Sequence, residues 1–121
     1  MKSGLDDVEW RSVCSVSCAL DILGDKWSLL ILRDLLIREQ STFTQFLHSP
    51  ERISTNILAA RLAKLHGYGL IARTPGASKR SFIYTLTPKS RDLEPVIRAL
   101  GVWSSKHLSR HQPGLVGMDV A

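Results

Sequence analysis

The chain has 121 residues, of which 44% are hydrophobic and 22% are charged, and its formal net charge at pH 7 is +5. This length and composition predict one globular domain and exclude an intrinsically disordered chain. No apolar run approaches the roughly 20 residues of a membrane-spanning helix, and the acidic N-terminus is unlike a signal peptide, so we expect a cytoplasmic protein with reduced cysteines.

The first part of the chain predicts three helices. Apolar residues at helical spacing indicate the first one over residues 13–23, where Gly24 interrupts the pattern. Asp25 is placed to cap a second helix over residues 26–38. A third, short helix is expected at residues 43–47.

The next helix is expected over residues 55–66. Ser54 is a candidate for its N-cap, and Gly67 is placed to end it. A helical wheel gathers its apolar residues on one side and small or polar residues on the other. The apolar side holds Ile57, Leu58, Leu62 and Leu65, and the opposite side holds Asn56, Ala59, Ala60 and Ala63.

A β-hairpin and a final helix complete the predicted elements. Residues 70–73 and 82–86 read as two strands joined by the turn 75–80. A last helix is expected over residues 88–109, and the Gly- and Pro-containing tail 113–121 is expected to be disordered.

This order of elements predicts a mainly α fold with a small β-hairpin, which is a winged helix-turn-helix. Residues 1–112 then form a single DNA-binding domain that dimerises through its N- and C-terminal helices.

Charge is distributed unevenly along the chain. Between Glu51 and Asp92 there is no acidic residue, although eight of the 16 Lys and Arg residues lie in this stretch. Such a segment pairs poorly with itself and suits a polyanion, with nucleic acid as the first candidate. Charge alone is equally compatible with a solvated basic face, and the order of the elements decides in favour of double-stranded DNA. The eight residues are Arg52, Arg61, Lys64, Arg73, Lys79, Arg80, Lys89 and Arg91.

Several separate motifs resemble one family. Cys14 is followed by residues 19–33, which are similar to that family's Gly-Lys-Trp helix start, and the similarity extends to about Trp103. On these motifs the chain resembles the HxlR-type transcriptional regulators, a branch of the MarR-like winged-helix group. The resemblance implies a homodimeric bacterial regulator that binds operator DNA. The other matching residues are Ile53, Ser54, Leu58, Arg61, Leu62, Leu65, Gly69, Leu70, Ile71, Arg73, Tyr84, Thr85, Leu86, Thr87, Leu93, Glu94 and Pro95.

The chain departs from the family pattern at four places. Ser15 stands where the family usually has proline, and Asp25 replaces a second glycine. Thr42 stands in place of an arginine, and Ile83 in place of a glutamate on the returning strand. These differences concern the operator sequence and the effector more than the fold.

The helix over residues 55–66 is the expected recognition helix, because the N-terminal residues of such a helix reach base edges in the major groove. Ordinary surface polarity or capping is the alternative role for its polar residues, and capping is the simpler one for Ser54. The candidates for base contact are Thr55, Asn56, Ala59 and Ala60, and those for phosphate contact are Thr42, Arg52, Ser54, Lys64, Lys79 and Arg80.

The apolar residues at both ends of the chain exceed what so small a domain can bury alone, which favours a dimer. The expected interface residues are Leu5, Trp10, Leu93, Val96, Ile97, Leu100 and Trp103.

Cys14 and Cys18 lie on one face of the first helix. Some members of the resembled family sense oxidants through a cysteine matching Cys14, which makes an oxidant or an unknown small molecule the candidate effector. An inert thiol is the alternative. No catalytic motif, metal site or cofactor is expected. The rival functions are a winged-helix module that binds an acidic protein and a non-specific nucleic-acid-binding protein.

Overall fold

A computed structural model gives the structure of the chain and describes residues 4–117. The predicted winged helix-turn-helix is confirmed, with a three-stranded antiparallel sheet in the order β1-β3-β2. The elements are the 3₁₀ helix η1 (Gly4–Asp7), α1 (Ser15–Leu23), α2 (Ser28–Arg38), β1 (Gln40–Thr42), α3 (Phe43–Leu47), α4 (Thr55–Gly67), β2 (Ile71–Pro75), β3 (Phe82–Leu86), α5 (Pro88–Arg91) and α6 (Glu94–His107).

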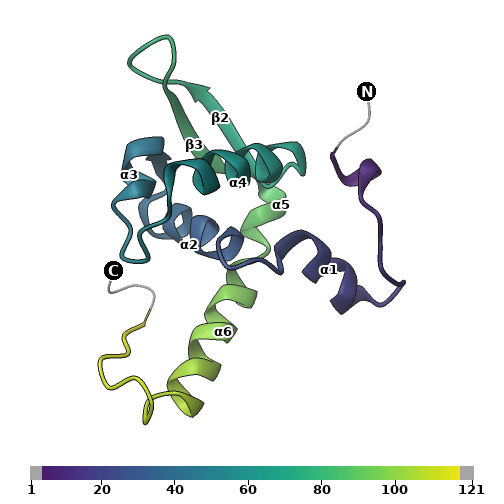
Figure 1. The fold of residues 1–121 in the computed structure, drawn as a ribbon, viewed down its shortest axis with the longest axis vertical. Helices are drawn as coiled ribbons and strands as arrows, with labels where there is room; N and C mark the ends of the chain where they lie inside the picture. Colours follow the sequence, from purple (N-terminus) through teal and green to yellow (C-terminus); the bar gives the residue numbers. More distant parts are fainter. Residues whose placement is uncertain (1–3, 118–121) are drawn as a thin grey trace.

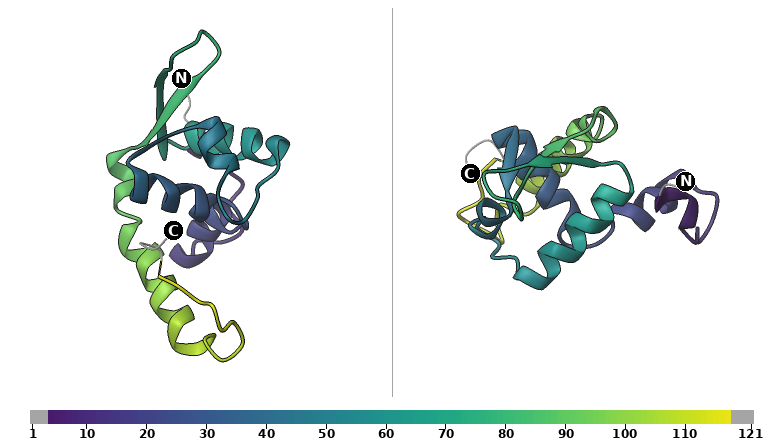
Figure 2. Two further views of the ribbon diagram at one scale, coloured as in Figure 1. Left: turned by 90° about the vertical axis from the view of Figure 1, so that its left-hand side faces the viewer. Right: turned by 90° about the horizontal axis from the view of Figure 1, so that it is seen from above.

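The hairpin β2–β3 and helix α6 project from opposite ends of the body, and α2 and α4 lie between them (Figure 1). The N-terminal segment with η1 and α1 stands out to one side of the body (Figure 2). The hairpin, helix α6 and the N-terminal segment therefore lie at the periphery of the body.

The core lies between α2, α3, α4 and the sheet. Leu32, Leu35 and Leu58 are fully buried there, and the ring of Phe46 packs at 6.0 Å from that of Tyr84. This core joins α3 and α4 to the sheet, so the helix-turn-helix and the wing share one support. The remaining buried hydrophobic residues are Leu23, Ile31, Ile53, Leu62, Leu65, Leu70, Ile71, Leu86 and Ile97.

Helix α2 begins two residues later than predicted, and its N-cap residue is Trp27 rather than Asp25. The Asp25 carboxylate accepts hydrogen bonds from the backbone N–H groups of Trp27 and Ser28, at 2.9 and 3.0 Å. The turn between α1 and α2 therefore depends on a carboxylate where the resembled family usually has glycine.

Helix α4 ends later than predicted, because Gly67 stays inside the helix. Tyr68 is the C-cap, and Gly69 follows with a φ of +76°. That left-handed conformation suits glycine, so Gly69 is the residue that stops the helix. Ile57, predicted to face the core, is 40% exposed.

The strand β1 was not expected. It comprises three residues and pairs with β3 through Ser41 opposite Tyr84. A three-residue strand has too short a pattern to be seen in sequence, and the Thr42 at its end also caps α3.

The prediction of one continuous final helix is wrong, because the helix is broken between Arg91 and Glu94. Thr87 and Ser90 form a capping box on α5, and Pro95 lies in the first turn of α6. Proline has no N–H to donate and clashes with the carbonyl four residues earlier, so it favours a fresh helix start.

The ends of the described chain are open. In α1 only Leu23 is buried, whereas Val16 and Leu20, two of the apolar residues at helical spacing, are exposed.

Within the predicted tail, residues 113–117 form neither helix nor strand, and residues 118–121 lie outside the described residues. Across residues 4–117 no helix has the length and apolar character needed to cross a bilayer.

Candidate nucleic-acid interface

Helix α3 is fixed at its N-terminal end by Thr42. The Thr42 hydroxyl accepts a hydrogen bond from the Gln45 N–H, and the Gln45 side chain accepts one from the Thr42 N–H, at 3.2 and 2.9 Å. This capping box positions α3 across the start of α4. Thr42, predicted to contact phosphate, therefore has a structural role that occupies its backbone N–H.

The loop from α3 to α4 makes a tight turn at Arg52. Its φ is +57°, an unusual conformation for a residue other than glycine, and its N–H donates to the Ser49 carbonyl at 3.0 Å. The Arg52 side chain is exposed beside the N-terminal end of α4.

One face of α4 is open to solvent. Ser54 caps the helix by accepting a hydrogen bond from the Ile57 N–H at 3.3 Å, so its predicted capping role is confirmed. The four residues predicted to contact bases are all exposed, and Ala63 continues the same face. The four are Thr55, Asn56, Ala59 and Ala60. The small alanine side chains allow the backbone of the helix to approach a partner surface closely.

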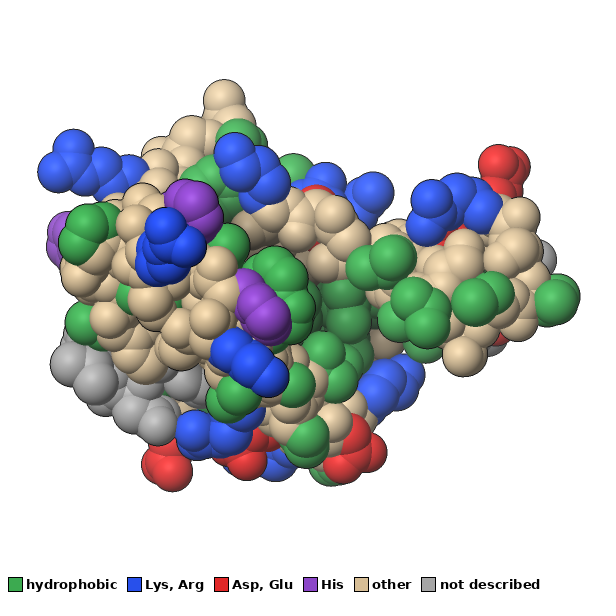
Figure 3. All heavy atoms as spheres, turned by 90° about the horizontal axis from the view of Figure 1, so that it is seen from below, with side chains coloured by type: hydrophobic (Ala, Val, Ile, Leu, Met, Phe, Trp, Pro, Cys, Tyr) green, Lys and Arg blue, Asp and Glu red, His purple; other side chains and the backbone are tan. Residues whose placement is uncertain are grey.

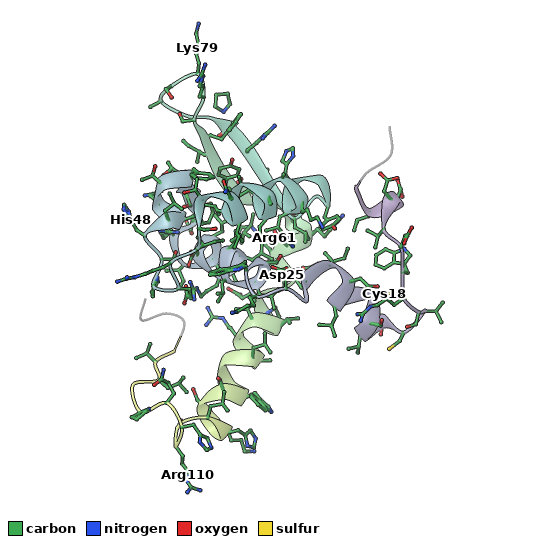
Figure 4. All side chains as sticks on the ribbon, viewed as in Figure 1. Cys18, Asp25, His48, Arg61, Lys79 and Arg110 are labelled. Carbon is green, nitrogen blue, oxygen red and sulfur yellow. The ribbon has the colours of Figure 1, made fainter. Side chains whose placement is uncertain are left out.

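The wing ends in a loop that two serines hold together. Ser78 N–H donates to the Ser81 hydroxyl at 3.0 Å, and Gly76 N–H donates to the Ser81 carbonyl at 2.9 Å. A Cβ at Gly76 would lie 2.6 Å from the Ser81 hydroxyl oxygen, so any other residue there would require the Ser81 side chain to move and its hydrogen bonds to change. Lys79 extends outward at the tip, and Arg80 follows it, also exposed (Figure 4).

Arg73 adds a cation to the wing that the sequence reasoning did not assign to the site. Its guanidinium lies 4.4 Å from the centre of the Phe82 ring, on the neighbouring strand. Stacking on an aromatic ring holds the arginine extended along the wing without neutralising it. The sequence did contain a signal for this contact, namely an arginine and a phenylalanine on the two strands of the predicted hairpin. Pairs of this kind often interact across neighbouring strands.

Among residues 4–117, one basic residue of the acid-free stretch forms an ion pair. Arg61 forms an ion pair with Asp25 at 3.6 Å (Figure 4). Within residues 4–117 the other seven have no ion pair with a carboxylate. Burial opposes ionisation of Asp25, but hydrogen bonds from Ser28 and Trp27 and the charge of Arg61 outweigh it and lower its pKa. Arg61 therefore has a structural role.

The predicted dimer residues fall into two groups. Trp10, Val96, Leu100 and Trp103 are exposed large hydrophobic residues. Leu5 and Leu93 are half-buried, and Ile97 lies in the core of the single chain. Figure 3 shows hydrophobic side chains on both the body and the N-terminal lobe that stands beside it. Further exposed hydrophobic residues of the N-terminal segment and of α6 were not predicted to lie in the interface, among them Val13, Val16, Leu20 and Val102.

The two cysteines are free thiols at the start of α1. Cys14 is exposed at the N-cap position, where the backbone N–H groups of Ser17 and then Val16 lower the pKa of its thiol, although it forms no regular capping hydrogen bond. The Cys18 thiol donates to the Ser12 carbonyl at 3.3 Å. The exposed position and lowered pKa of Cys14 favour its reactive thiolate form.

A family model described as HxlR-like helix-turn-helix matches residues 22–112. The HTH-type transcriptional regulator sll1512 of Synechocystis sp. is 34% identical over 94 residues, which are 76% of this chain and 68% of that protein. The HTH-type transcriptional regulator YdeP of Bacillus subtilis is 33% identical over 98 residues, which are 80% of this chain and 76% of YdeP.

Solved structures share the fold. The candidate transcription factor PA1607 has a TM-score of 0.71 at 36% identity, covering 80% of this chain and 67% of that one. The redox regulator HypR in its oxidized form has a TM-score of 0.69 at 25% identity, covering 78% and 97%. The reduced form of the transcriptional regulator YodB from B. subtilis has a TM-score of 0.65 at 26% identity, covering 79% and 95%.

Proposed function

The chain belongs to the HxlR-like helix-turn-helix family of DNA-binding transcriptional regulators, and from this premise we propose that it binds a palindromic operator as a homodimer. The observation that carries the proposal is the contrast in pairing: seven of the eight cations in the acid-free stretch lack a carboxylate partner among the described residues. Unpaired cations on an open face gain by displacing counterions from DNA.

The roles of the residues follow from their places. Helix α4 enters the major groove, with Asn56 and Thr55 at base edges and Ala59 and Ala60 against thymine methyl groups. Lys79 and Arg80 of the wing contact the backbone beside that groove. The further phosphate contacts are Thr42, Arg52, Ser54 and Lys64, together with Arg73.

A twofold dimer explains why the operator is palindromic. Two copies of α4 read two half-sites about one helical turn apart. The proposed dimer covers the exposed residues of the N-terminal segment and of α6, in particular Trp10 and Trp103, which are 46% and 57% exposed. Such large apolar side chains stabilise an interface when they are buried.

Selection of bound fragments from genomic DNA tests the proposal. We expect enrichment of an inverted repeat, with at least about a thousandfold tighter binding to it than to random duplex at the same salt concentration. Equal affinity for all duplexes favours a non-specific nucleic-acid-binding protein, and no binding to duplex at low salt favours the protein-interaction module.

The variant Trp103→Asp tests the dimer. An unpaired charge in place of an apolar anchor converts the dimer to folded monomers, measured by sedimentation, and weakens binding to the full palindrome more than to a half-site. Ser105→Asp, on the same helix and already exposed, serves as the control. An undisturbed Trp103→Asp dimer places the interface elsewhere.

The proposal includes redox control through Cys14. Two Cys14 thiols, one from each protomer, form a disulfide while hydrogen peroxide takes up their two electrons and two protons and becomes two waters. The lowered pKa of Cys14 supports this, as does the similarity to a redox regulator. Mild oxidant is expected to change operator affinity in wild type and in Cys18→Ser, but not in Cys14→Ser. Equal responses in all three proteins contradict it.

A further inference from the structure

The open face of α4 carries few functional groups. Its five residues are Thr55, Asn56, Ala59, Ala60 and Ala63, and all of them are exposed. Three of the five present only a methyl group, so hydrogen bonding from this face depends on Asn56 and Thr55. Neither of these two side chains has a hydrogen-bond partner among residues 4–117, which leaves both available to the edge of a base.

The cations of α4 lie away from the centre of this face. Arg61 is half-buried and pairs with Asp25 at 3.6 Å, which directs it toward the turn before α2. Lys64 and His66 belong to the last turn of the helix, whereas the N-terminal residues of a recognition helix contact base edges. The part of α4 that would reach the bases is therefore uncharged.

This uncharged face lacks the usual partners of a G·C pair. In the major groove, guanine is read mainly by arginine or lysine, and cytosine by a carboxylate. None of the five residues of the open face is a cation, and the whole stretch between Glu51 and Asp92 contains no acidic residue. The face does hold the partners of an A·T pair, which are an asparagine for adenine and small apolar groups for the methyl group of thymine.

We propose that the base pairs read by α4 in each half-site are A·T pairs, with an adenine bound by Asn56 and thymines against Ala59 and Ala60. This assignment rests on the operator binding proposed above, because it requires α4 to enter the major groove. Asn56 and Ala63 are seven residues apart, which is about 10 Å along a helix and corresponds to about three base pairs. Each half-site therefore contains a run of about three A·T pairs beneath α4.

Selection from duplexes with a randomised centre tests the base preference. The bound fraction is expected to contain an inverted repeat with neighbouring A·T pairs in each half. Asn56→Ala, selected in parallel, is expected to lose the preference at one position of each half, which marks where Asn56 lies. A G·C pair fixed at the marked position overturns the assignment to adenine, and G·C pairs fixed on both sides of it overturn the contacts with thymine. Absence of any inverted repeat contradicts the operator binding itself, so the two failures are distinguishable.

Base analogues test the individual contacts. 7-Deazaadenine lacks the N7 acceptor, so at the marked adenine it is expected to weaken binding of the wild type about fivefold and to leave binding of Asn56→Ala unchanged. Uracil in place of a neighbouring thymine lacks the methyl group and is expected to weaken binding about threefold. Equal losses with 7-deazaadenine in both proteins overturn the adenine contact. Unchanged binding with uracil overturns the thymine contacts.

Asn56→Arg provides a gain of function, because arginine makes the two-bond contact with guanine. The selected base at the marked position is expected to change from adenine to guanine. Ile57→Arg is the matched control, since it adds the same guanidinium to the next residue, whose side chain points about 100° away around the helix. This control is expected to keep adenine at the marked position. Adenine retained by Asn56→Arg, or guanine selected equally by both variants, overturns the placement of Asn56.

Discussion

Arginines on two sides of this molecule are in opposite situations. In the middle of α2, Arg33 contacts Asp34 at 2.8 Å and Glu51 at 2.7 Å, and its side chain is only 13% exposed. On the wing, Arg80 is exposed, and no carboxylate among the described residues lies within ion-pair distance of it. The two residues contribute equally to the net charge of the sequence. In the fold, however, Arg33 joins two segments of the chain, whereas Arg80 remains exposed to solvent.

The paired cluster shows how strongly charges are held when they are structural. The hydrogen bonds that Arg33 donates to Glu51 lower the pKa of the Glu51 carboxyl group and raise the pKa of Arg33, although burial opposes both shifts. Asp34 also accepts a hydrogen bond from Ser49 and lies 3.5 Å from Arg38. The cluster fixes the loop before α4 to α2, so it supports the proposed DNA-binding surface.

The largest effect is expected from breaking the paired cluster. Asp34→Ala removes the carboxylate that Arg33 and Arg38 share, and leaves their two partly buried guanidinium groups without this partner. We expect the free energy of unfolding to fall by about 3 kcal/mol. This value is at the lower end of the range for buried ion pairs, because Arg33 keeps its contact with Glu51. Urea denaturation at one protein concentration measures it.

The exposed pair between Glu94 and Arg98, at 3.6 Å, supplies the control for that prediction. Arg98→Gln is expected to cost less than about 0.5 kcal/mol, because both side chains are about half exposed. Equal losses for Arg98→Gln and Asp34→Ala would show that burial does not distinguish the two kinds of pair.

The open face of α4 is expected to give the next largest effect. Asn56→Ala removes two possible hydrogen bonds to a base, which is expected to cost about 1–3 kcal/mol at the best operator and to relax preference at one symmetric pair of positions. Affinity for random duplex stays nearly unchanged. Competition binding with operator and random DNA measures both, and an equal loss on every sequence would assign Asn56 to backbone contact.

The wing is expected to act through charge alone. Changing Lys79 and Arg80 to alanine is expected to weaken binding to all duplexes alike, and the slope of log affinity against log salt falls by about 0.9 for each phosphate that the wing no longer neutralises. Lys106→Ala, on the opposite projection of the molecule, is the control. A slope that does not change removes the wing from the interface.

Much of the fold could be predicted because its signals are local. Ser54, the apolar residues of α4 and the strand at residues 82–86 are each specified by neighbours in sequence. The pairing of β1 with β3 and the contact of η1 with α4 are long-range and leave no periodic pattern. The break before α6 had a local signal in Pro95, but the continuous apolar stripe on either side obscured it.

The candidate site was predictable in position and not in pairing. The acid-free stretch marks where cations gather, yet it does not show which of them find partners from outside the stretch. Asp25 comes from the turn before α2 and engages Arg61 across the fold. Likewise, the cation–π contact of Arg73 depends on strand register, which composition does not contain.

The smallest effect is expected from Arg61, the one cation of the basic stretch that forms an ion pair within residues 4–117. Arg61 and Asp25 are each about one quarter exposed, so Arg61→Gln is expected to cost less than about 1 kcal/mol at pH 7. Because the pKa of Asp25 is lowered in the folded state, the stability from its ionised form is present above its unfolded value of about 3.9 and is lost as pH falls through the folded value. The difference in the free energy of unfolding between wild type and Arg61→Gln, measured by urea denaturation, should therefore shrink on acidification below about pH 4.

The control is Arg91→Gln, because Arg91 is a basic residue of the same stretch without an ion pair among residues 4–117. The free-energy difference between wild type and this variant should show no such pH dependence. A difference that persists at acid pH would mean that Arg61 stabilises α4 through packing of its stem, and that the paired and unpaired cations differ less than the geometry implies.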